Sequence, residues 1–189
     1  MKRVIIVHGW YGKPDAGWMK WLNKELTDRG IEVIAKKMPN PDNPQIEPWV
    51  EALKKIAGEI DEDTYFVGHS IGCQTILRYL ESTDEKTKIG GAVFVAGWFS
   101  LQGLETDEEK ETSKPWLNTP IKFDKIRPKI GKVFAVFSED DPWVPVTDAR
   151  WFKDELAAET LIENGKGHYV ENEIMKIEPV LDKLIAWIG

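Results

Sequence analysis

Short runs of β-branched and aromatic residues alternate with amphipathic segments along this sequence. The runs show little polar alternation, which is typical of strands covered on both faces, so the pattern predicts an α/β fold. We expect a mostly parallel central sheet of about six strands with helices on both faces. The expected strands are 3–7, 32–35, 64–67, 92–95, 132–137 and 160–162, and the expected helices are 18–26, 46–60, 71–80 and 180–188.

Length, charge and cysteine content limit the classes of function. A chain of 189 residues suffices for a single domain, expected over 1–189, and its net charge of −7 argues against a nucleic-acid partner. Cys73 is the only cysteine, so no internal disulfide can form. The N-terminal apolar run, 4–7, is too short for a signal peptide, and no stretch approaches a membrane span. We expect a cytoplasmic protein without a membrane partner, and its protein partners stay unknown.

The pattern G-x-S-x-G occurs at Gly68-His69-Ser70-Ile71-Gly72, after an expected strand and before an expected helix. In this context it predicts a tight turn that projects the Ser70 hydroxyl above the sheet as a nucleophile. The two glycines let the backbone pass closely, and the Ile71 amide at the helix start can bind a developing oxyanion. The alternative is a serine in an ordinary β–α turn.

A serine nucleophile needs a base, and the chain has three histidines. His69 adjoins the serine, so the two side chains should diverge, and His8 ends the first expected strand. His168 lies in a loop after the last expected strand and is therefore the candidate base. The histidines lack the spacing of a metal site and no phosphate-binding glycine motif occurs, so we expect no metal and no cofactor.

The triad also needs a carboxylate that orients the imidazole. Asp140 and Asp141 follow strand 132–137, at the edge where open α/β sheets build their sites. The order serine, aspartate, histidine is that of α/β-hydrolases. After the first strand, a glycine-flanked turn could aim the Trp10 amide at the same oxyanion as the Ile71 amide, or it is a plain β–α turn.

The segment 98–128 breaks the alternation, because it is rich in charge, threonine, glycine and proline. It is either a solvated connection or a small cap over the active site. A cap should bring some of Trp98, Phe99, Trp116 and Leu117 close to Ser70. Tryptophans in loops near the carboxyl edge could line an apolar acyl pocket, and these are Trp10, Trp98, Trp116 and Trp143, of which Trp98, Trp116 and Trp143 are the candidate substrate-binding residues.

Several stretches together resemble the small serine hydrolases of the retinoblastoma-binding-protein-nine and YdeN-like family, a compact branch of the α/β-hydrolase superfamily. In that family's pattern the second aspartate of the pair is the triad acid, which assigns this role to Asp141. The resemblance implies a shortened α/β-hydrolase fold that cleaves small acyl esters or amides without a cofactor. The matching stretches are His8-Gly9-Trp10-Tyr11-Gly12, Met38-Pro39-Asn40-Pro41, Val67-Gly68-His69-Ser70, Asp140-Asp141-Pro142 with Val144-Pro145, and Gly167-His168.

The sequence thus predicts a carboxylesterase-like serine hydrolase that acts on a small-molecule acyl substrate. His168 would take the proton of Ser70, which attacks a carbonyl to form an acyl-enzyme that water then hydrolyses. A peptidase or amidase would use the same groups. A non-catalytic binding protein on this fold is the alternative from another class.

Overall fold

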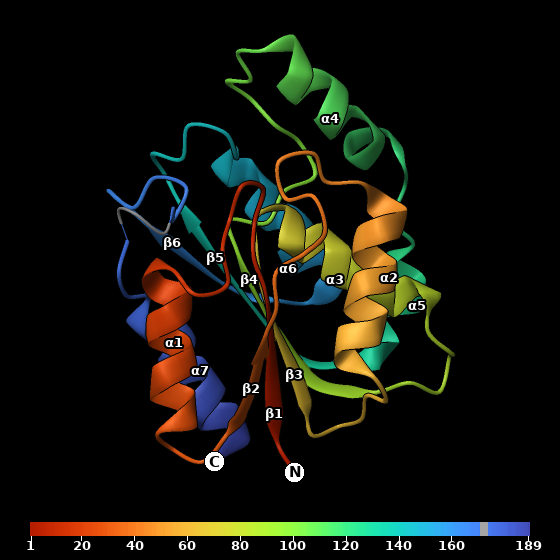
Figure 1. Ribbon diagram of the computed structural model, residues 1–189, viewed down its shortest axis with the longest axis vertical. Coiled ribbons are helices and arrows are strands. Elements are labelled where there is room, and N and C mark those ends of the chain that lie inside the picture. The colour runs from red at the N-terminus through yellow and green to blue at the C-terminus, as the bar shows by residue number, and fades with distance from the viewer. Residues whose placement is uncertain (171–173) are drawn as a thin grey trace.

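The computed structural model describes residues 1–170 and 174–189 and contains one six-stranded parallel sheet in the order β2-β1-β3-β4-β5-β6 (Figure 1). All six expected strands are present, several of them longer by one to three residues at an end. The expected α/β architecture with a central parallel sheet of about six strands is therefore confirmed. The strands are β1 Arg3–Val7, β2 Glu32–Ala35, β3 Thr64–His69, β4 Ile89–Val95, β5 Ile130–Ser138 and β6 Glu159–Glu163.

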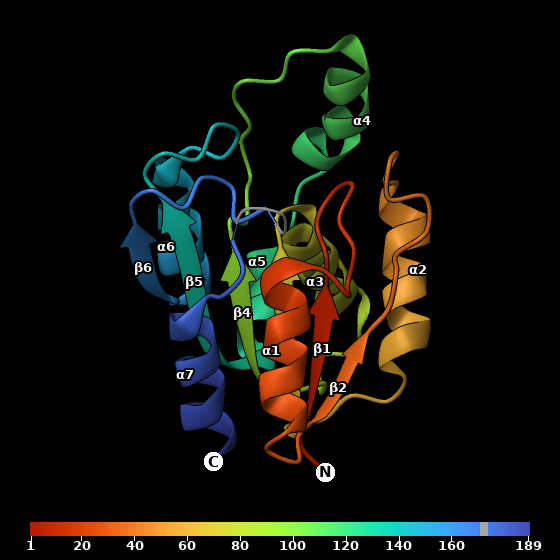
Figure 2. The same ribbon diagram turned by 60° about the vertical axis from the view of Figure 1, so that its left-hand side comes forward.

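Helices cover both faces of the sheet. Helices α1 and α7 pack on one face, and α2, α3, α5 and α6 pack on the other (Figure 2). The helices are α1 Gly17–Thr27, α2 Ile46–Ala57, α3 Ile71–Ser82, α4 Asp107–Asn118, α5 Phe123–Ile126, α6 Ala149–Leu156 and α7 Glu178–Ile188, with short 3-10 turns at Arg127–Lys129 and Val146–Asp148. Within the described residues, no helix combines the length and the apolar character needed to cross a membrane.

Burial on both faces explains the nearly continuous apolar runs of the central strands. Successive side chains of a strand point to opposite faces. In β1, Ile5 and Val7 pack against the α2 and α3 layer, whereas Val4 and Ile6 pack against the α1 and α7 layer. Alternate positions of the strand therefore face different helix layers. Both sets of positions are apolar because both faces of the sheet are covered.

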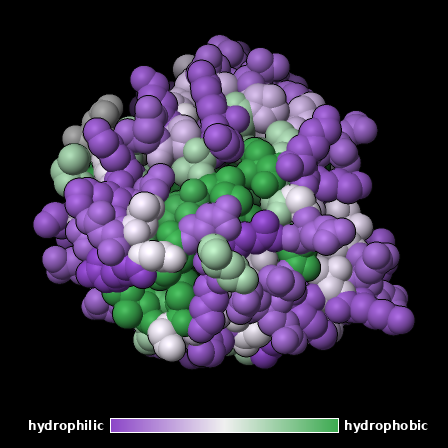
Figure 3. All heavy atoms as spheres, turned by 60° about the horizontal axis from the view of Figure 1, so that its bottom comes forward, coloured by the Kyte–Doolittle hydropathy of each residue, from purple (hydrophilic) through white to green (hydrophobic). Residues whose placement is uncertain are grey.

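The candidate site lies at the carboxyl end of the sheet, where the strand order switches. The chain adds β2 on one side of β1 and β3 on the other, and ligands of open α/β sheets bind outside such a switch point. The loops after β1 and β3 carry Gly9 and Ser70 to this point, while both termini lie at the opposite end (Figure 1). Figure 3 views that opposite end, where a strip of hydrophobic side chains is bordered by hydrophilic ones.

Helix α4 stands above the carboxyl edge of the sheet, so the segment 98–128 is partly helical (Figures 1 and 2). A capping box starts the helix: the Thr106 hydroxyl accepts from the Glu109 amide at 3.1 Å, and Glu109 Oε2 accepts from the Thr106 amide at 2.8 Å. The spacing of these two residues was the local signal for a helix start. The charge and proline content of the segment favoured a loop, so helix α4 was not predicted. Helix α6 was not predicted either.

Candidate active site

Ser70 occupies a strained turn between β3 and α3. Its φ of 53° and ψ of −123° are sparsely populated by residues with a side chain, and such strain concentrates at functional sites. A Cβ on Gly68 would lie 2.9 Å from the Cys73 amide nitrogen, and one on Gly72 would lie 2.4 Å from the Val7 carbonyl oxygen. Both glycines are required because the backbone segments of the turn pass too closely for a side chain.

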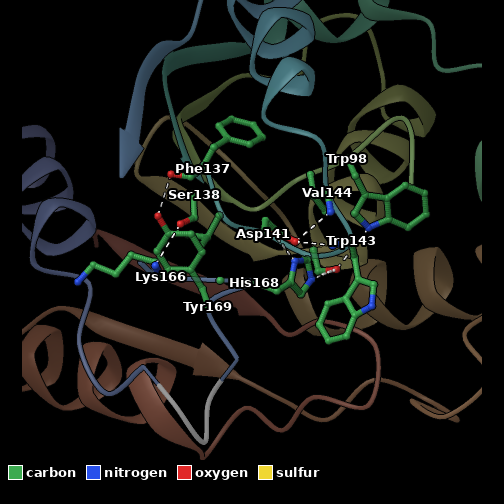
Figure 4. A network of polar contacts seen from close by, with 12 residues as sticks. Trp98, Phe137, Ser138, Asp141, Trp143, Val144, Lys166, His168 and Tyr169 are labelled. Atoms are coloured by element: carbon green, nitrogen blue, oxygen red, sulfur yellow. Dashed lines mark hydrogen bonds and ion pairs between the residues drawn. The ribbon is translucent and has the colours of Figure 1, made fainter. Parts of the chain in front are cut away.

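A chain of hydrogen bonds joins Ser70 to His168 and Asp141 (Figure 4). The distance from His168 Nε2 to Ser70 Oγ is 2.8 Å, and that from His168 Nδ1 to Asp141 Oδ2 is 2.7 Å. A carboxylate at Nδ1 selects the tautomer with its proton on Nδ1, so that Nε2 accepts from the serine hydroxyl. All three residues are buried.

The two neighbouring aspartates have different partners. Asp141 places Oδ2 on the imidazole, while its Oδ1 accepts the amides of Trp143 and Val144, both at 2.9 Å. These two amides fix the carboxylate plane, so that Oδ2 points at the ring (Figure 4). Local sequence patterns did not decide between Asp140 and Asp141, and Asp141 is the one in contact with His168.

Asp140 supports the loop that carries His168. Its Oδ1 accepts the amides of Gly165, Lys166 and Gly167 at 2.8, 3.2 and 3.3 Å. The hydroxyl of Ser138, together with the amides of Gly167 and Gly165, holds the pKa of Asp140 below its ordinary value. The two adjacent carboxylates therefore have different roles. Asp141 contacts the His168 imidazole, and Asp140 fixes the backbone that precedes His168.

Tyr169 fixes the same loop from its other side. Its hydroxyl lies 2.9 Å from the Phe137 carbonyl oxygen and 3.0 Å from Glu163 Oε2, and burial raises its pKa (Figure 4). The indole of Trp18 donates to the Tyr169 carbonyl oxygen at 2.9 Å. The His168 loop is therefore held by β5, β6 and α1. No local sequence pattern indicated that Tyr169 and Trp18 support it.

The other two histidines serve the framework of the site. His69 Nε2 lies 2.7 Å from the His168 carbonyl oxygen and donates to it, and burial lowers the pKa of His69 to about 3. His8 Nε2 accepts a hydrogen bond from the Met38 amide at 2.8 Å, and His8 Nδ1 donates to the Gly9 carbonyl oxygen. Burial lowers the pKa of His8 too. Both rings are therefore neutral near pH 7 and hold backbone, which leaves His168 as the histidine on Ser70.

The buried neutral state of His69 predicts a pH-dependent stability. Between the ordinary pKa of 6.5 and the folded value of about 3, the unfolded chain binds a proton that the folded chain does not. The free energy of unfolding should therefore fall as pH decreases through this window. The variant His69→Gln keeps an N–H donor but does not titrate. We expect its free energy of unfolding, measured by urea denaturation, to fall less between about pH 7 and about pH 4.5 than that of the parent. An unchanged difference between the two pH values would contradict this assignment.

Two backbone amides near Ser70 have no hydrogen-bond acceptor among the residues that the structure describes. Ile71 is the first residue of α3, so its amide has no acceptor within the helix. The amides of Tyr11 and Gly12 donate to Pro41 and Gly9, whereas that of Trp10 has no acceptor in 1–170 and 174–189. A Cβ on Gly9 would lie 3.2 Å from Ser70 Cβ, which shows how closely this loop approaches the serine.

A cavity of about 310 Å³ opens above Ser70 and His168. Its apolar walls are Trp10, Trp98, Leu101, Leu104, Trp143 and Val170. Leu101, Leu104 and Glu109 come from the segment 98–128, whose first part therefore borders the site as a cap would. Among the described residues, no group of three or more His, Cys, Asp or Glu side chains is placed to hold a metal ion.

Trp116, one of the candidates for lining an acyl pocket, lies outside this cavity and borders a separate hollow. Its indole donates to the Pro44 carbonyl oxygen at 3.0 Å and packs edge-on against Trp49. The position of Trp116 on α4 turns it toward α2 and α3, where it is fully buried. Phe99 and Leu117 likewise line a separate hollow, so of the four apolar side chains of the expected cap only Trp98 contacts Ser70.

The sequence matches the model of the serine hydrolase family over residues 4–185. The chain belongs to this family. The YdeN protein of Bacillus subtilis is 29% identical over 181 residues, which cover 95% of this chain and 92% of that protein. The serine hydrolase RBBP9 of Rattus norvegicus is 25% identical over 183 residues, 96% of this chain and 89% of that protein. The resemblance stated from the motifs is thus confirmed.

Two solved structures are similar to this chain in three dimensions. The crystal structure of the ydeN gene product of B. subtilis superposes with a TM-score of 0.90 at 28% identity, covering 99% of this chain and 98% of that one. Est1E of Butyrivibrio proteoclasticus superposes with a TM-score of 0.73 at 16% identity, covering 99% and 88%. The second similarity concerns the fold alone.

Proposed function

We propose that this serine hydrolase cleaves small acyl esters with Ser70 as nucleophile, His168 as base and Asp141 as the carboxylate that orients the base. The observation that supports the proposal is the unbroken chain of two hydrogen bonds, 2.7 and 2.8 Å long, that ends on the hydroxyl of a strained elbow serine. The adjoining apolar cavity gives an acyl group a place to bind.

The proposed reaction proceeds in two steps. His168 Nε2 takes the Ser70 proton as Oγ attacks the carbonyl carbon, and the amides of Ile71 and Trp10 bind the resulting oxyanion. The imidazolium returns its proton to the leaving alkoxide, and the acyl group stays on Oγ. Water then gives a proton to His168 and attacks the acyl carbon. The imidazolium returns this proton to Ser70 Oγ as the C–Oγ bond breaks, which releases a carboxylic acid and restores the serine hydroxyl.

The size of the cavity favours a short acyl chain over a polymer, because ligand sites of about 300 Å³ are at the lower end for small molecules. Trp98 and Trp143 provide flat apolar surfaces beside the serine, and Leu101 and Leu104 close the side formed by the 98–128 segment. The same groups could cleave an amide, whose poorer leaving group needs stronger protonation. Matched ester and amide substrates with one acyl group would separate the two activities.

Leu104 should limit the length of the acyl chain. Leu104→Ala removes part of a cavity wall, so kcat/KM should shift toward longer p-nitrophenyl esters by about tenfold relative to acetate, the usual effect of a methylene or two in an apolar pocket. Leu117→Ala is the matched control, since Leu117 belongs to the same segment but lines a different hollow. Equal chain-length profiles for the two variants would mean that the segment does not bound the acyl site.

A carbamate ester tests the proposed function through its covalent intermediate. A p-nitrophenyl dialkylcarbamate should release one nitrophenolate per active site and leave a slowly hydrolysed carbamoyl group on Ser70, located by mass spectrometry of peptides. p-Nitrophenyl acetate should be turned over before this treatment and not after it. Release without an adduct on Ser70, or persistent esterase activity after complete carbamoylation, would contradict the proposal.

A further inference from the structure

The oxygen of Ser70 has a second polar neighbour that a serine triad does not require. The indole Nε1 of Trp98 lies 3.3 Å from Ser70 Oγ, on a side chain that is 1% exposed. His168 Nε2 lies 2.8 Å from the same oxygen. Figure 4 shows the Trp98 indole next to the hydrogen-bonded chain of Asp141 and His168.

We infer that Trp98 is a catalytic residue whose indole N–H donates to the Ser70 nucleophile. The inference rests on the proposed function, since it assigns a further group to the same reaction. A serine hydroxyl has one proton and two lone pairs, whereas an indole N–H only donates. With Trp98 on one lone pair, the proton has His168 as its acceptor, and the second lone pair is left to attack the substrate.

The same contact strengthens as the reaction starts. When His168 removes the proton, negative charge develops on Oγ, and a hydrogen bond to a charged oxygen is stronger than one to a neutral hydroxyl. A distance of 3.3 Å is long for a neutral N–H···O contact, and such contacts shorten as charge develops. Trp98 therefore lowers the barrier to acylation, because its contribution is larger in the transition state than in the resting enzyme.

The backbone around Trp98 is fixed from two directions. Gln74 Nε2 donates to the Trp98 carbonyl oxygen at 3.0 Å, and Gln74 belongs to α3, the helix that begins next to Ser70. Buried Asp148 accepts the amides of Phe99 and Ser100 at 2.6 and 2.8 Å. The indole is thereby held in register with the nucleophile.

The turn that leads into Trp98 is itself strained. Ala96, at the end of β4, has a φ of 46°, a conformation that a residue with a side chain seldom adopts. A Cβ on Gly97 would lie 2.5 Å from the Phe152 ring, so this turn admits no side chain there. The turn is strained and closely packed, and it directs one donor at the reacting oxygen. These are properties of a preorganised catalytic group.

The alternative is that Trp98 is only a wall of the cavity, and an isosteric replacement separates the two roles. Substitution of Trp98 by β-(3-benzothienyl)alanine, introduced by nonsense suppression, replaces N–H by sulfur and keeps the ring size. The same replacement at Trp116 is the matched control, because Trp116 also donates its indole N–H to a carbonyl oxygen, away from Ser70. Thermal unfolding of both variants reports whether the fold is kept.

The measurement is the second-order rate of Ser70 phosphonylation by a small fluorophosphonate, with kcat/KM for acetate, butyrate and hexanoate esters. We expect the Trp98 isostere to lose about 10- to 100-fold in every rate, irrespective of acyl length, and the Trp116 isostere to keep the parent rates. Parent rates in the Trp98 isostere, or a loss confined to one acyl length, would overturn the inference. Neither of those outcomes affects the proposed function, which fails instead if the parent protein is not modified at Ser70.

Discussion

Replacement of Ser70 by alanine is expected to lower kcat for ester hydrolysis by about a million-fold, the loss seen when a serine triad lacks its nucleophile. The Ser70 side chain contacts His168 and Trp98, whereas the turn itself is held by its backbone, through the bond from the Ser70 amide to the Val95 carbonyl oxygen. Alanine meets the same strain at this φ as serine does. The variant should therefore fold with a melting temperature close to that of the parent.

Ser82→Ala is the matched control, because Ser82 lies at the far end of α3 and its hydroxyl donates to the Tyr79 carbonyl oxygen. It should retain the parent rate. Initial rates with p-nitrophenyl acetate, corrected for spontaneous hydrolysis, give the comparison. Activity of Ser70→Ala within about a hundredfold of the parent would show that hydrolysis proceeds through another group.

Replacement of Asp141 by asparagine is expected to cost about ten-thousand-fold in kcat, as misorientation of the triad histidine does elsewhere. An asparagine can still accept the amides of Trp143 and Val144 through Oδ1, so the turn should persist. Its NH₂ group would then face His168 Nδ1 and favour the tautomer with the proton on Nε2. That tautomer cannot accept the Ser70 proton.

The adjacent substitution, Asp140→Asn, provides the matched control. Asp140 does not contact the His168 ring, but its carboxylate accepts three amides of the loop before His168. The loss of the carboxylate should reduce kcat by less than about tenfold and lower the thermal stability of the loop. The two variants differ by one position and carry the same change of charge. Equal losses of kcat would contradict the assignment of the triad acid to Asp141.

Local sequence patterns predicted the sheet and the elbow because both depend on local properties. The central strands β1, β3, β4 and β5 are buried on two faces and therefore form nearly continuous apolar runs, which predicted them. The edge strands β2 and β6 are only partly buried, and their β-branched residues predicted them. The turn at Ser70 needs small residues at 68 and 72, where neighbouring backbone leaves no space for a Cβ. The order of the three candidate triad residues along the chain then limited the fold to α/β-hydrolases.

Features that depend on the direction of a side chain could not be predicted in this way. Asp140 and Asp141 are adjacent in a turn, so composition and spacing did not choose between them, and the choice relied on the family resemblance. Trp98 and Trp116 lie in one segment, but the first follows a strand end and the second lies on the inner face of α4. Only the three-dimensional placement brings one indole to Ser70 and takes the other into the core.

Reaction with a fluorophosphonate followed by peptide mapping shows whether Ser70 is the nucleophile. We expect one phosphonyl group per chain, located on Ser70, and no modification of Ser70→Ala. Modification of another residue, or labelling that persists in Ser70→Ala, would contradict this assignment.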